Sequence, residues 1–266
     1  MLHAVGRSEC ALPAAEMDTV EGKTMAKTEE LPGYQRGEPI HDSSTSTVYR
    51  ARRAADGLGV VVKRSNGTAV SARQLTRYRN EFELLRSLDI DGVVRAHDLI
   101  RHDDRIALVL EDLPGLSLRQ WLERNPIARL EERLSVGAQL AAILADVHSA
   151  NVIHKDISSH NVVYDAESRR CKLIDFGIAT RLRSEEQKFQ AAAALEGTLA
   201  YIAPEQTGRM NRSLDYRADL YSLGVTLYEL VTGSLPYESS DPLEMVHFHI
   251  AGKPEAACER SSTVPR

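Results

Sequence analysis

The chain has 266 residues, of which 42% are hydrophobic and 27% charged, so it can bury a core without disulfides. Its net charge of −5 argues against a simple nucleic-acid-binding protein, because such proteins usually carry a positive excess. The three cysteines are odd in number and far apart, which predicts a reduced, cytoplasmic protein without a disulfide framework or zinc ribbon. No apolar stretch approaches the roughly 20 residues of a membrane span, and the N-terminus is not typical of a signal peptide.

The composition changes along the chain. Residues 1–30 mix small, charged and hydroxyl side chains without periodicity, so we expect a disordered lead-in there. Residues 253–266 also lack a pattern and are expected to form an unstructured tail. Between them, a first third rich in strand signals precedes a remainder rich in helix signals. This order predicts the α+β class, with two lobes of different composition.

Short β-branched runs mark the first third. Residues 46–51 and 58–63 flank Asp56-Gly57, a turn signal, and together they predict a β-hairpin. Residues 106–110 form an apolar run of strand length and predict another strand.

Apolar residues then recur with helical spacing. Tyr78, Phe82 and Leu85 predict a first helix, and two later stripes predict two more: Leu140, Ile143, Leu144 and Val147, then Leu220, Leu223, Leu227 and Val231. Glu81 shares the apolar face of the first helix. A buried, unpaired carboxylate costs several kcal/mol, so Glu81 needs a cation, and Lys63 in a neighbouring strand is the candidate. The alternative is a solvated Glu81 at the edge of that face.

One stretch carries the strongest chemical signal. His154-Lys155-Asp156 is followed by Asn161, and Asp175-Phe176-Gly177 comes 175 − 156 = 19 residues after Asp156. Carboxylates and an amide held together suit Mg²⁺, which prefers hard oxygen ligands and shares them with phosphate. A carboxylate can also accept a proton from a hydroxyl nucleophile. The alternative interpretation is a loop and a turn that contain Asp and Asn as common turn residues.

With these motifs, residues 34–250 resemble a eukaryotic-like bacterial Ser/Thr protein kinase. Further parts of the resemblance are Val60-Val61-Val62-Lys63, Glu81, Glu111-Asp112-Leu113, the segment Gly197-Thr198-Leu199-Ala200-Tyr201-Ile202-Ala203-Pro204-Glu205, and Asp219. The resemblance implies a two-lobed kinase fold, with a β-rich N-lobe at 34–112 and a mostly helical C-lobe at 113–252. Few residues follow Glu205, so we expect the C-lobe to lack its last helices and the chain to be truncated.

The resemblance also implies roles for individual residues. Asp156 would deprotonate the substrate hydroxyl, and Lys63, held by Glu81, would contact the α- and β-phosphates of ATP. Asn161 and Asp175 would hold Mg²⁺ and complete the catalytic set. Nucleotide contacts are implied for Lys63, Glu81, Val48, Val61, Glu111, Leu113, Ser43 and Ser46. The implied partner is a protein substrate, with no nucleic acid and no membrane span.

Four departures from the kinase pattern stand out. The phosphate-covering loop has His41, Ser43 and Ser46 at its three glycine positions, so hydroxyls would replace some backbone contacts. Val61 replaces an alanine and should crowd the adenine. Ser158 stands where most Ser/Thr kinases have a lysine near the γ-phosphate, and Lys155 replaces the arginine before the catalytic Asp.

These departures bear on regulation and subfamily. Lys155 offers a phosphate only a point charge, and Glu185 or Glu186 can satisfy it, so we expect no need for phosphorylation at Ser184. Together with the segment from Gln206 to Arg217, the departures resemble the N-terminal kinase domain of large hybrid proteins with AAA-ATPase, GAF and sensor histidine kinase domains.

Two other functions remain open at this point. The glycine-free loop and Ser158 favour a pseudokinase or nucleotide-dependent interaction module. A small-molecule phosphotransferase would share the Asp–Asn–Asp set, but the segment from Gly197 to Glu205 resembles a peptide-docking surface and argues against it.

Overall fold

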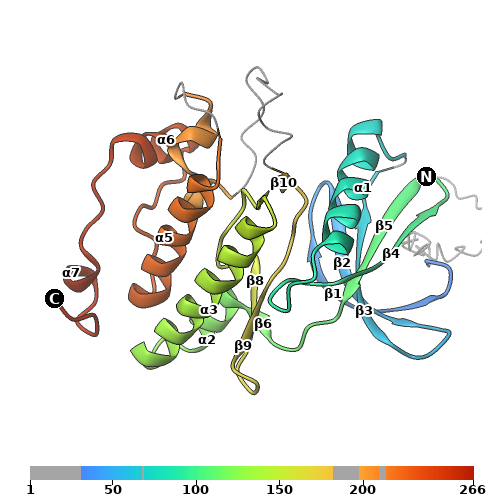
Figure 1. The fold of residues 1–266 in the computed structure, drawn as a ribbon, viewed down its shortest axis with the longest axis horizontal. Helices are drawn as coiled ribbons and strands as arrows, with labels where there is room; N and C mark the ends of the chain where they lie inside the picture. The colour runs from blue at the N-terminus through green and yellow to red at the C-terminus, as the bar shows by residue number, and fades with distance from the viewer. Residues whose placement is uncertain (1–30, 68, 182–197, 210–213) are drawn as a thin grey trace, which may run out of the picture. The chain divides into compact units, whose positions relative to one another are not determined.

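The computed structural model describes residues 31–67, 69–181, 198–209 and 214–266 (Figure 1). The expected disordered lead-in at 1–30 lies outside these residues. Leu31–Arg266 forms one unit, in which an antiparallel sheet with one helix precedes a mostly helical part. This arrangement confirms the α+β class predicted from the sequence.

The N-terminal sheet is antiparallel, with the strand order β1-β2-β3-β5-β4. Its strands are β1 (Tyr34–Asp42), β2 (Ser46–Arg53), β3 (Gly59–Ser65), β4 (Ala96–His102) and β5 (Arg105–Glu111). The predicted hairpin is confirmed as β2 and β3, and the predicted strand at 106–110 as β5. Gly57 in the hairpin turn has a φ of +72°, which favours glycine.

Strand β3 lies between β2 and β5, so both of its edges pair with neighbouring strands. Side chains alternate along a strand, and Val60 and Val62 are fully buried on one face, in a cluster with Tyr49 and Val109. Val61 faces the other way and packs on the larger core. Lys63 follows Val61 on that second face.

The predicted first helix is confirmed as α1 (Ala72–Ser87). Its start is fixed by a capping box, in which the Ser71 hydroxyl accepts from the Gln74 amide at 3.2 Å and the Gln74 side chain accepts from the Ser71 amide at 3.1 Å. The buried face of α1 lies against β4 and β5. It consists of Tyr78, Glu81, Leu84 and Leu85.

Five helices and several short elements build the rest of the described chain (Figure 1). The helices are α2 (Leu118–Arg124), α3 (Leu130–Ser149), α5 (Arg217–Thr232), α6 (Pro242–Ala251) and α7 (Ala257–Arg260). Two small sheets join β6 (Leu116–Ser117), β8 (Val162–Asp165) and β9 (Arg170–Leu173), and β7 (Val152–Ile153) with β10 (Thr180–Arg181). Two 3-10 turns cover Leu199–Tyr201 and Pro204–Thr207.

The two predicted apolar stripes have different outcomes. All four residues of the first stripe are buried on α3, which confirms it. The second stripe is wrong in part, because Leu220 on α5 is 47% exposed. The buried face of α5 includes polar side chains, among them Asp219, Ser222, Thr226 and Glu229. An apolar period therefore identifies the helix but not the side that it buries.

The end of the chain is more ordered than the expected unstructured tail. Helix α7 lies within 253–266 and contacts α5. Arg260 donates to Glu255 at 3.1 Å and to Ser234 at 3.2 Å, which holds this turn in place. A single helical turn is too short to show an apolar period, so the sequence did not predict it. Within the described ranges, no helix combines the length and apolar character of a bilayer span.

Candidate active site

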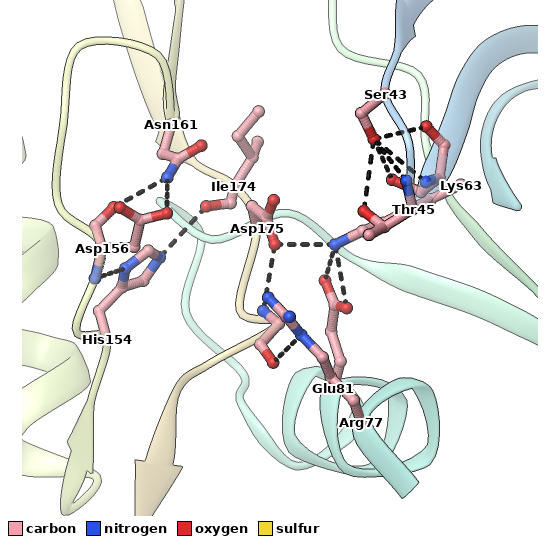
Figure 2. Close-up of polar contacts among 12 residues, drawn as sticks. Ser43, Thr45, Lys63, Arg77, Glu81, His154, Asp156, Asn161, Ile174 and Asp175 are labelled. Atoms are coloured by element: carbon pink, nitrogen blue, oxygen red, sulfur yellow. Dashed lines mark hydrogen bonds and ion pairs between the residues drawn. The ribbon is translucent and has the colours of Figure 1, made fainter. Parts of the chain in front are cut away.

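Lys63 is the centre of the candidate site. Its ammonium nitrogen donates to both carboxylate oxygens of Glu81 at 3.1 Å and to Oδ1 of Asp175 at 2.8 Å (Figure 2). Only 15% of the Lys63 side chain is exposed. Burial lowers the pKa of Lys63, but the two carboxylates outweigh burial and raise the pKa above its usual value. Lys63 is therefore a fixed cation at neutral pH.

Glu81 reaches Lys63 from the buried face of α1. Its side chain is 1% exposed, and the distance to the Lys63 ammonium is within that of an ion pair. Burial raises the pKa of Glu81, while the Lys63 ammonium acts in the opposite direction. The predicted pairing of a buried Glu81 with Lys63 is confirmed, and the alternative of a solvated Glu81 is wrong.

Asp175 begins the turn Asp175-Phe176-Gly177 and has a φ of +60°. Its Oδ1 accepts from Lys63 and also from the Gly177 amide at 3.1 Å. Burial raises the pKa of Asp175, but the Lys63 ammonium and these hydrogen bonds lower it to about 2. Phe176 is 1% exposed and meets the His154 ring edge-on, with the ring centroids 4.6 Å apart. The hydrogen bonds of Asp175 and the ring contact of Phe176 thus both fix the position of this turn.

A buried carboxylate of α5 anchors the loop that carries Asp156. Asp219 is fully buried and accepts from the amides of His154 at 2.8 Å and Lys155 at 2.7 Å. It also contacts Nε2 of His148, on α3, at 2.9 Å. Lys155 has a φ of +69°, a strained conformation that these bonds hold in place. Asp219, one of the residues that carry the kinase resemblance, thus anchors this loop.

The His154 ring is oriented by two backbone groups. Its Nδ1 accepts from the Asp156 amide at 3.2 Å, so its Nε2 carries the proton and donates to the Ile174 carbonyl at 3.1 Å (Figure 2). The side chain is fully buried. His154 therefore joins the loop that carries Asp156 to Ile174, the residue before Asp175.

Asp156 and Asn161 face each other across this loop. The Asn161 side-chain amide donates to Oδ2 and to the backbone carbonyl of Asp156, both at 2.9 Å (Figure 2). The second oxygen, Oδ1, accepts from the amide of Thr198 at 2.7 Å. The Ile174 amide donates to the Asn161 carbonyl at 2.9 Å, which ties this loop to the segment that ends at Asp175.

Two oxygens of the site are available to hold a metal, as far as the described part of the chain goes. Among the described residues, nothing donates a hydrogen bond to Oδ1 of Asn161 or Oδ2 of Asp175. The described ranges contain no group of three or more His, Cys, Asp or Glu side chains arranged to hold a metal alone. Two hard oxygen ligands are too few to bind a metal ion alone. They fit Mg²⁺, which usually takes its other ligands from phosphate groups and water.

Two of the predicted nucleotide contacts beyond Lys63, Val48 and Val61, lie on inner strands of the N-terminal sheet. Val48 pairs with Lys63 in the β2–β3 register, and Val61 pairs with Leu110. Glu111 is already engaged: its amide donates to the Arg95 carbonyl at 2.9 Å and its carboxylate binds Lys172 at 2.8 Å.

Leu113, the second predicted hinge contact, is half-buried against the main core. It lies just after β5, between the sheet and the helical part.

The hydroxyl-rich loop between β1 and β2 is braced from within. Ser43 Oγ accepts from the amides of Thr45 at 3.3 Å and Ser46 at 3.1 Å, and it donates to the Ser46 carbonyl at 3.0 Å (Figure 2). The Ser43 hydroxyl is therefore directed at the backbone of its own loop.

Asn66, just after β3, holds the same loop from the side. Its amide nitrogen donates to the Ser43 carbonyl at 2.7 Å, and its side-chain oxygen accepts from Thr47 at 2.8 Å. Its backbone amide donates to the Thr45 carbonyl at 2.9 Å. The sequence did not reveal this role, because an Asn before Gly67 is an ordinary turn signal.

Ser158 does not take the place of a phosphate-binding lysine. Its side chain is fully buried, and its hydroxyl has no hydrogen-bond partner within the described residues. Its neighbour Ser159 is bound instead, to the Tyr201 hydroxyl at 2.9 Å.

A buried hydrogen-bond network that the sequence did not predict supports the loop between Asp156 and Asn161. Tyr201 donates to Glu229 at 2.5 Å, and Arg119 binds the other oxygen of Glu229 at 2.8 Å. The Arg119 amide donates to the Ser159 carbonyl at 3.0 Å. The network thus connects α2, α5 and the segment after Thr198 with the loop between Asp156 and Asn161.

Some predicted features lie outside the described residues. They are Ser184 with Glu185 and Glu186, Gly197 at the start of the docking segment, and positions 210–213 of the subfamily segment.

Comparison with known families gives one match over most of the chain. The protein kinase domain family matches residues 34–263. This range includes every residue of the candidate site.

Curated relatives agree with that match. Serine/threonine-protein kinase PkaA of Streptomyces coelicolor is 33% identical over 248 residues, 87% of this chain and 44% of the relative. PrkC of Bacillus subtilis is 29% identical over 192 residues, 72% of this chain and 29% of the relative. Serine/threonine-protein kinase pkn3 of Myxococcus xanthus is 29% identical over 252 residues, 92% of this chain and 45% of the relative. The chain spans less than half the length of these relatives.

Proposed function

Because this chain belongs to the protein kinase family, we propose that it transfers the γ-phosphoryl group of ATP to serine or threonine hydroxyls of a protein substrate. One observation carries the proposal above all others. Segments far apart in sequence bring Glu81 and Asp175 into direct contact with Lys63, and the loop of Asp156 and Asn161 is tied to Ile174, just before Asp175.

In this proposal Lys63 binds the α- and β-phosphates. Its raised pKa keeps it charged at neutral pH, and Glu81 fixes its position from the buried side. Phosphoryl transfer asks for positioning and charge neutralisation more than covalent chemistry, so a rigid cation suits this role.

Asn161 and Asp175 are the proposed Mg²⁺ ligands, through the two oxygens that accept no hydrogen bond from the described residues. The low pKa of Asp175 supports this role, because the side chain stays ionised down to about pH 2. Mg²⁺, when bound, neutralises the charge of the phosphates.

Asp156 is the proposed acceptor of the substrate proton. Its two oxygens accept from Thr198 and Asn161, and each has a second lone pair for a substrate hydroxyl. These bonds fix the carboxylate, so a hydroxyl arriving beside it meets a preoriented base.

The proposed adenine site lies between Val48 and Val61 on one side and the backbone of Glu111 and Leu113 on the other. The amide of Glu111 is bound to Arg95, so Glu111 offers the base only its carbonyl. The half-buried Val61 is larger than alanine, which narrows the site. Ser43 and Ser46 contribute through the shape of their loop.

We further propose the two-lobed kinase fold, with an N-lobe at 34–112 and a C-lobe at 113–252, as one domain of a larger cytoplasmic signalling protein. The antiparallel sheet before residue 112 and the helices after it support the two lobes. The short coverage of the curated relatives supports the larger protein. The resemblance to large hybrid proteins suggests that the other domains are of the AAA-ATPase, GAF and sensor histidine kinase types.

A second candidate is a nucleotide-binding module that transfers no phosphate. The buried Ser158 favours it, because no cation stands at that position next to the γ-phosphate.

Transfer to a protein separates the two. The chain is incubated with Mg²⁺ and γ-labelled ATP and a generic acceptor such as myelin basic protein, with Asp156→Asn as the control, and nucleotide binding is measured by thermal shift. Kinase activity predicts label on serine or threonine that disappears in Asp156→Asn. A thermal shift without label in either protein would establish the binding module instead.

A further inference from the structure

A closed ring of contacts joins helix α1 to the turn that carries Asp175 (Figure 2). Lys63 binds both Glu81 and Asp175. Arg77, one helical turn before Glu81, donates from Nε to the carbonyl oxygen of Gly177 at 2.7 Å. Gly177 donates its own amide back to Asp175 at 3.1 Å. Helix α1 and this turn are therefore connected at two points, one through Lys63 and the other through Arg77.

The Arg77 contact depends on a glycine at 177. A Cβ at that position would lie 3.2 Å from Nε and from Nη2 of Arg77, and 3.0 Å from Oδ1 of Asp175. Such distances are too short for ordinary packing, so a larger residue would push the guanidinium away from the carbonyl. The absence of a side chain lets Arg77 approach the backbone closely.

Helix α1 needs such a tether because it carries a charge into the core. The Glu81 side chain is 1% exposed, and burying a carboxylate costs free energy that its contacts have to offset. Lys63 also has a second carboxylate, that of Asp175, and would keep an ion pair if α1 moved away. Contacts other than the Lys63–Glu81 pair therefore contribute to holding α1 in place, among them the packing of Tyr78, Leu84 and Leu85.

The opposite end of α1 has a similar contact. Arg181, in β10, donates to the hydroxyl of Ser87 at 2.6 Å. The chain that follows Asp175 thus contacts α1 at Arg77 and again at its last residue, on both sides of Glu81.

We propose that Arg77 is a positioning residue, which keeps Glu81 on Lys63 by tying α1 to the carbonyl of Gly177. This inference rests on the proposed function only for its effect on phosphoryl transfer. Its effect on the Lys63–Glu81 pair is independent of any substrate.

The test compares Arg77→Ala with Arg79→Ala. Both arginines are on α1 and lie toward solvent, so each change removes one positive charge and leaves no cavity in the core. Arg77→Lys is the partial rescue, because an ammonium is a single-point donor in place of the guanidinium. Two quantities are measured: the rate at which an amine-acylating reagent labels Lys63, by mass spectrometry, and kcat and KM for Mg²⁺-ATP.

In Arg77→Ala we expect faster acylation of Lys63, because an ammonium that is no longer held by the buried Glu81 carboxylate is more accessible to the reagent. We expect kcat to fall roughly tenfold, the size of one lost charge-assisted hydrogen bond. Arg79→Ala should match the parent in both quantities, and Arg77→Lys should lie between.

Equal acylation of Lys63 in the parent, Arg77→Ala and Arg79→Ala would overturn the proposal. Faster acylation in Arg77→Ala, with no transfer by the parent chain, would support the positioning role and overturn the proposed kinase activity instead. Faster acylation with an unchanged kcat would overturn the link between this contact and catalysis.

Discussion

Two polar loops face the candidate site, and they are held in opposite ways. The loop between β1 and β2 is braced locally, by the hydroxyl of Ser43 and by the side chain of Asn66. The loop from His154 to Asn161 is braced from a distance, by Asp219 on α5. The first set of contacts is exposed or half-buried, and the second is centred on a fully buried carboxylate.

This difference explains where the sequence can depart from the kinase pattern. Each hydrogen bond of the first loop contributes about 0.5–1.5 kcal/mol, so changes there alter local geometry and leave the fold intact. Loss of Asp219 would leave buried donors without a partner, which costs more. The glycine-free loop is the locally held one, and the loop that keeps the kinase motif is the one built into the core. We expect substitutions in the first loop to change nucleotide affinity and substitutions in the second to change rate.

The largest effect is expected between the two loops, at Lys63. Lys63→Ala should abolish phosphoryl transfer, because the phosphates lose their fixed cation. It also leaves Glu81 buried without a partner, so stability should fall by about 1–3 kcal/mol. Transfer is measured with labelled ATP and stability by urea unfolding. A variant that transfers phosphate at the parent rate would show that the assignment of Lys63 is wrong.

The next effect concerns the core-anchored side, at Asp175. Asp175→Asn removes a charged oxygen from the proposed metal pair, so binding of ATP in the presence of Mg²⁺ should weaken by about tenfold to a hundredfold. Binding of ATP with EDTA should change much less. Isothermal titration in both conditions measures the difference. An equal loss with and without Mg²⁺ would indicate a folding defect and contradict the metal role.

A smaller effect is expected on the locally braced side, at Asn66. Asn66→Ala removes the bonds to Ser43 and Thr47, so the loop should lose its fixed shape over the phosphates. We expect ATP affinity to fall about threefold to tenfold, the equivalent of about one or two hydrogen bonds, with adenosine affinity unchanged. Asn80→Ala, at an exposed position of α1, is the matched control. If adenosine and ATP lose affinity equally, the loop does not act on the phosphates.

The smallest effect is expected at Ser184, which lies outside the described residues. Ser184→Ala should transfer phosphate at the parent rate, before and after phosphatase treatment. The reason is that Arg77 ties α1 to Gly177 and Lys63 binds Glu81, and neither of these contacts involves Ser184. A large fall in rate for Ser184→Ala, or a phosphatase-treated parent that recovers only on rephosphorylation, would show that an added phosphate is required.

Helical periodicity and the cost of burying a charge were enough to predict the Lys63–Glu81 pair from the sequence. Glu81 falls on the buried face of a helix, and a buried carboxylate demands a cation, which leads to Lys63. The confirmed hairpin follows from its turn signal in the same way. These predictions succeeded because each depends on a repeating or unpaired feature that a single sequence displays.

The supporting residues gave no such signal. Arg77 and Asn66 act by donating to backbone carbonyls, and every residue has a carbonyl, so composition does not reveal which one is meant. Arg119 and Glu229 lie 110 positions apart and meet only in the folded chain. Leu220 was misplaced because α5 buries Asp219 and other polar side chains in place of an apolar stripe.

The attachment of the catalytic loop to Asp219 has a consequence for motion. A loop normally opens more readily than the helices beside it, because few buried contacts hold it. Here the amides of His154 and Lys155 are bonded to a buried side chain of α5, so they are released only when the helix itself moves. In terms of local unfolding, the start of this loop belongs to the same cooperative unit as α5. The base of the proposed reaction is thus supported by one of the stable parts of the chain, although it is carried on a loop.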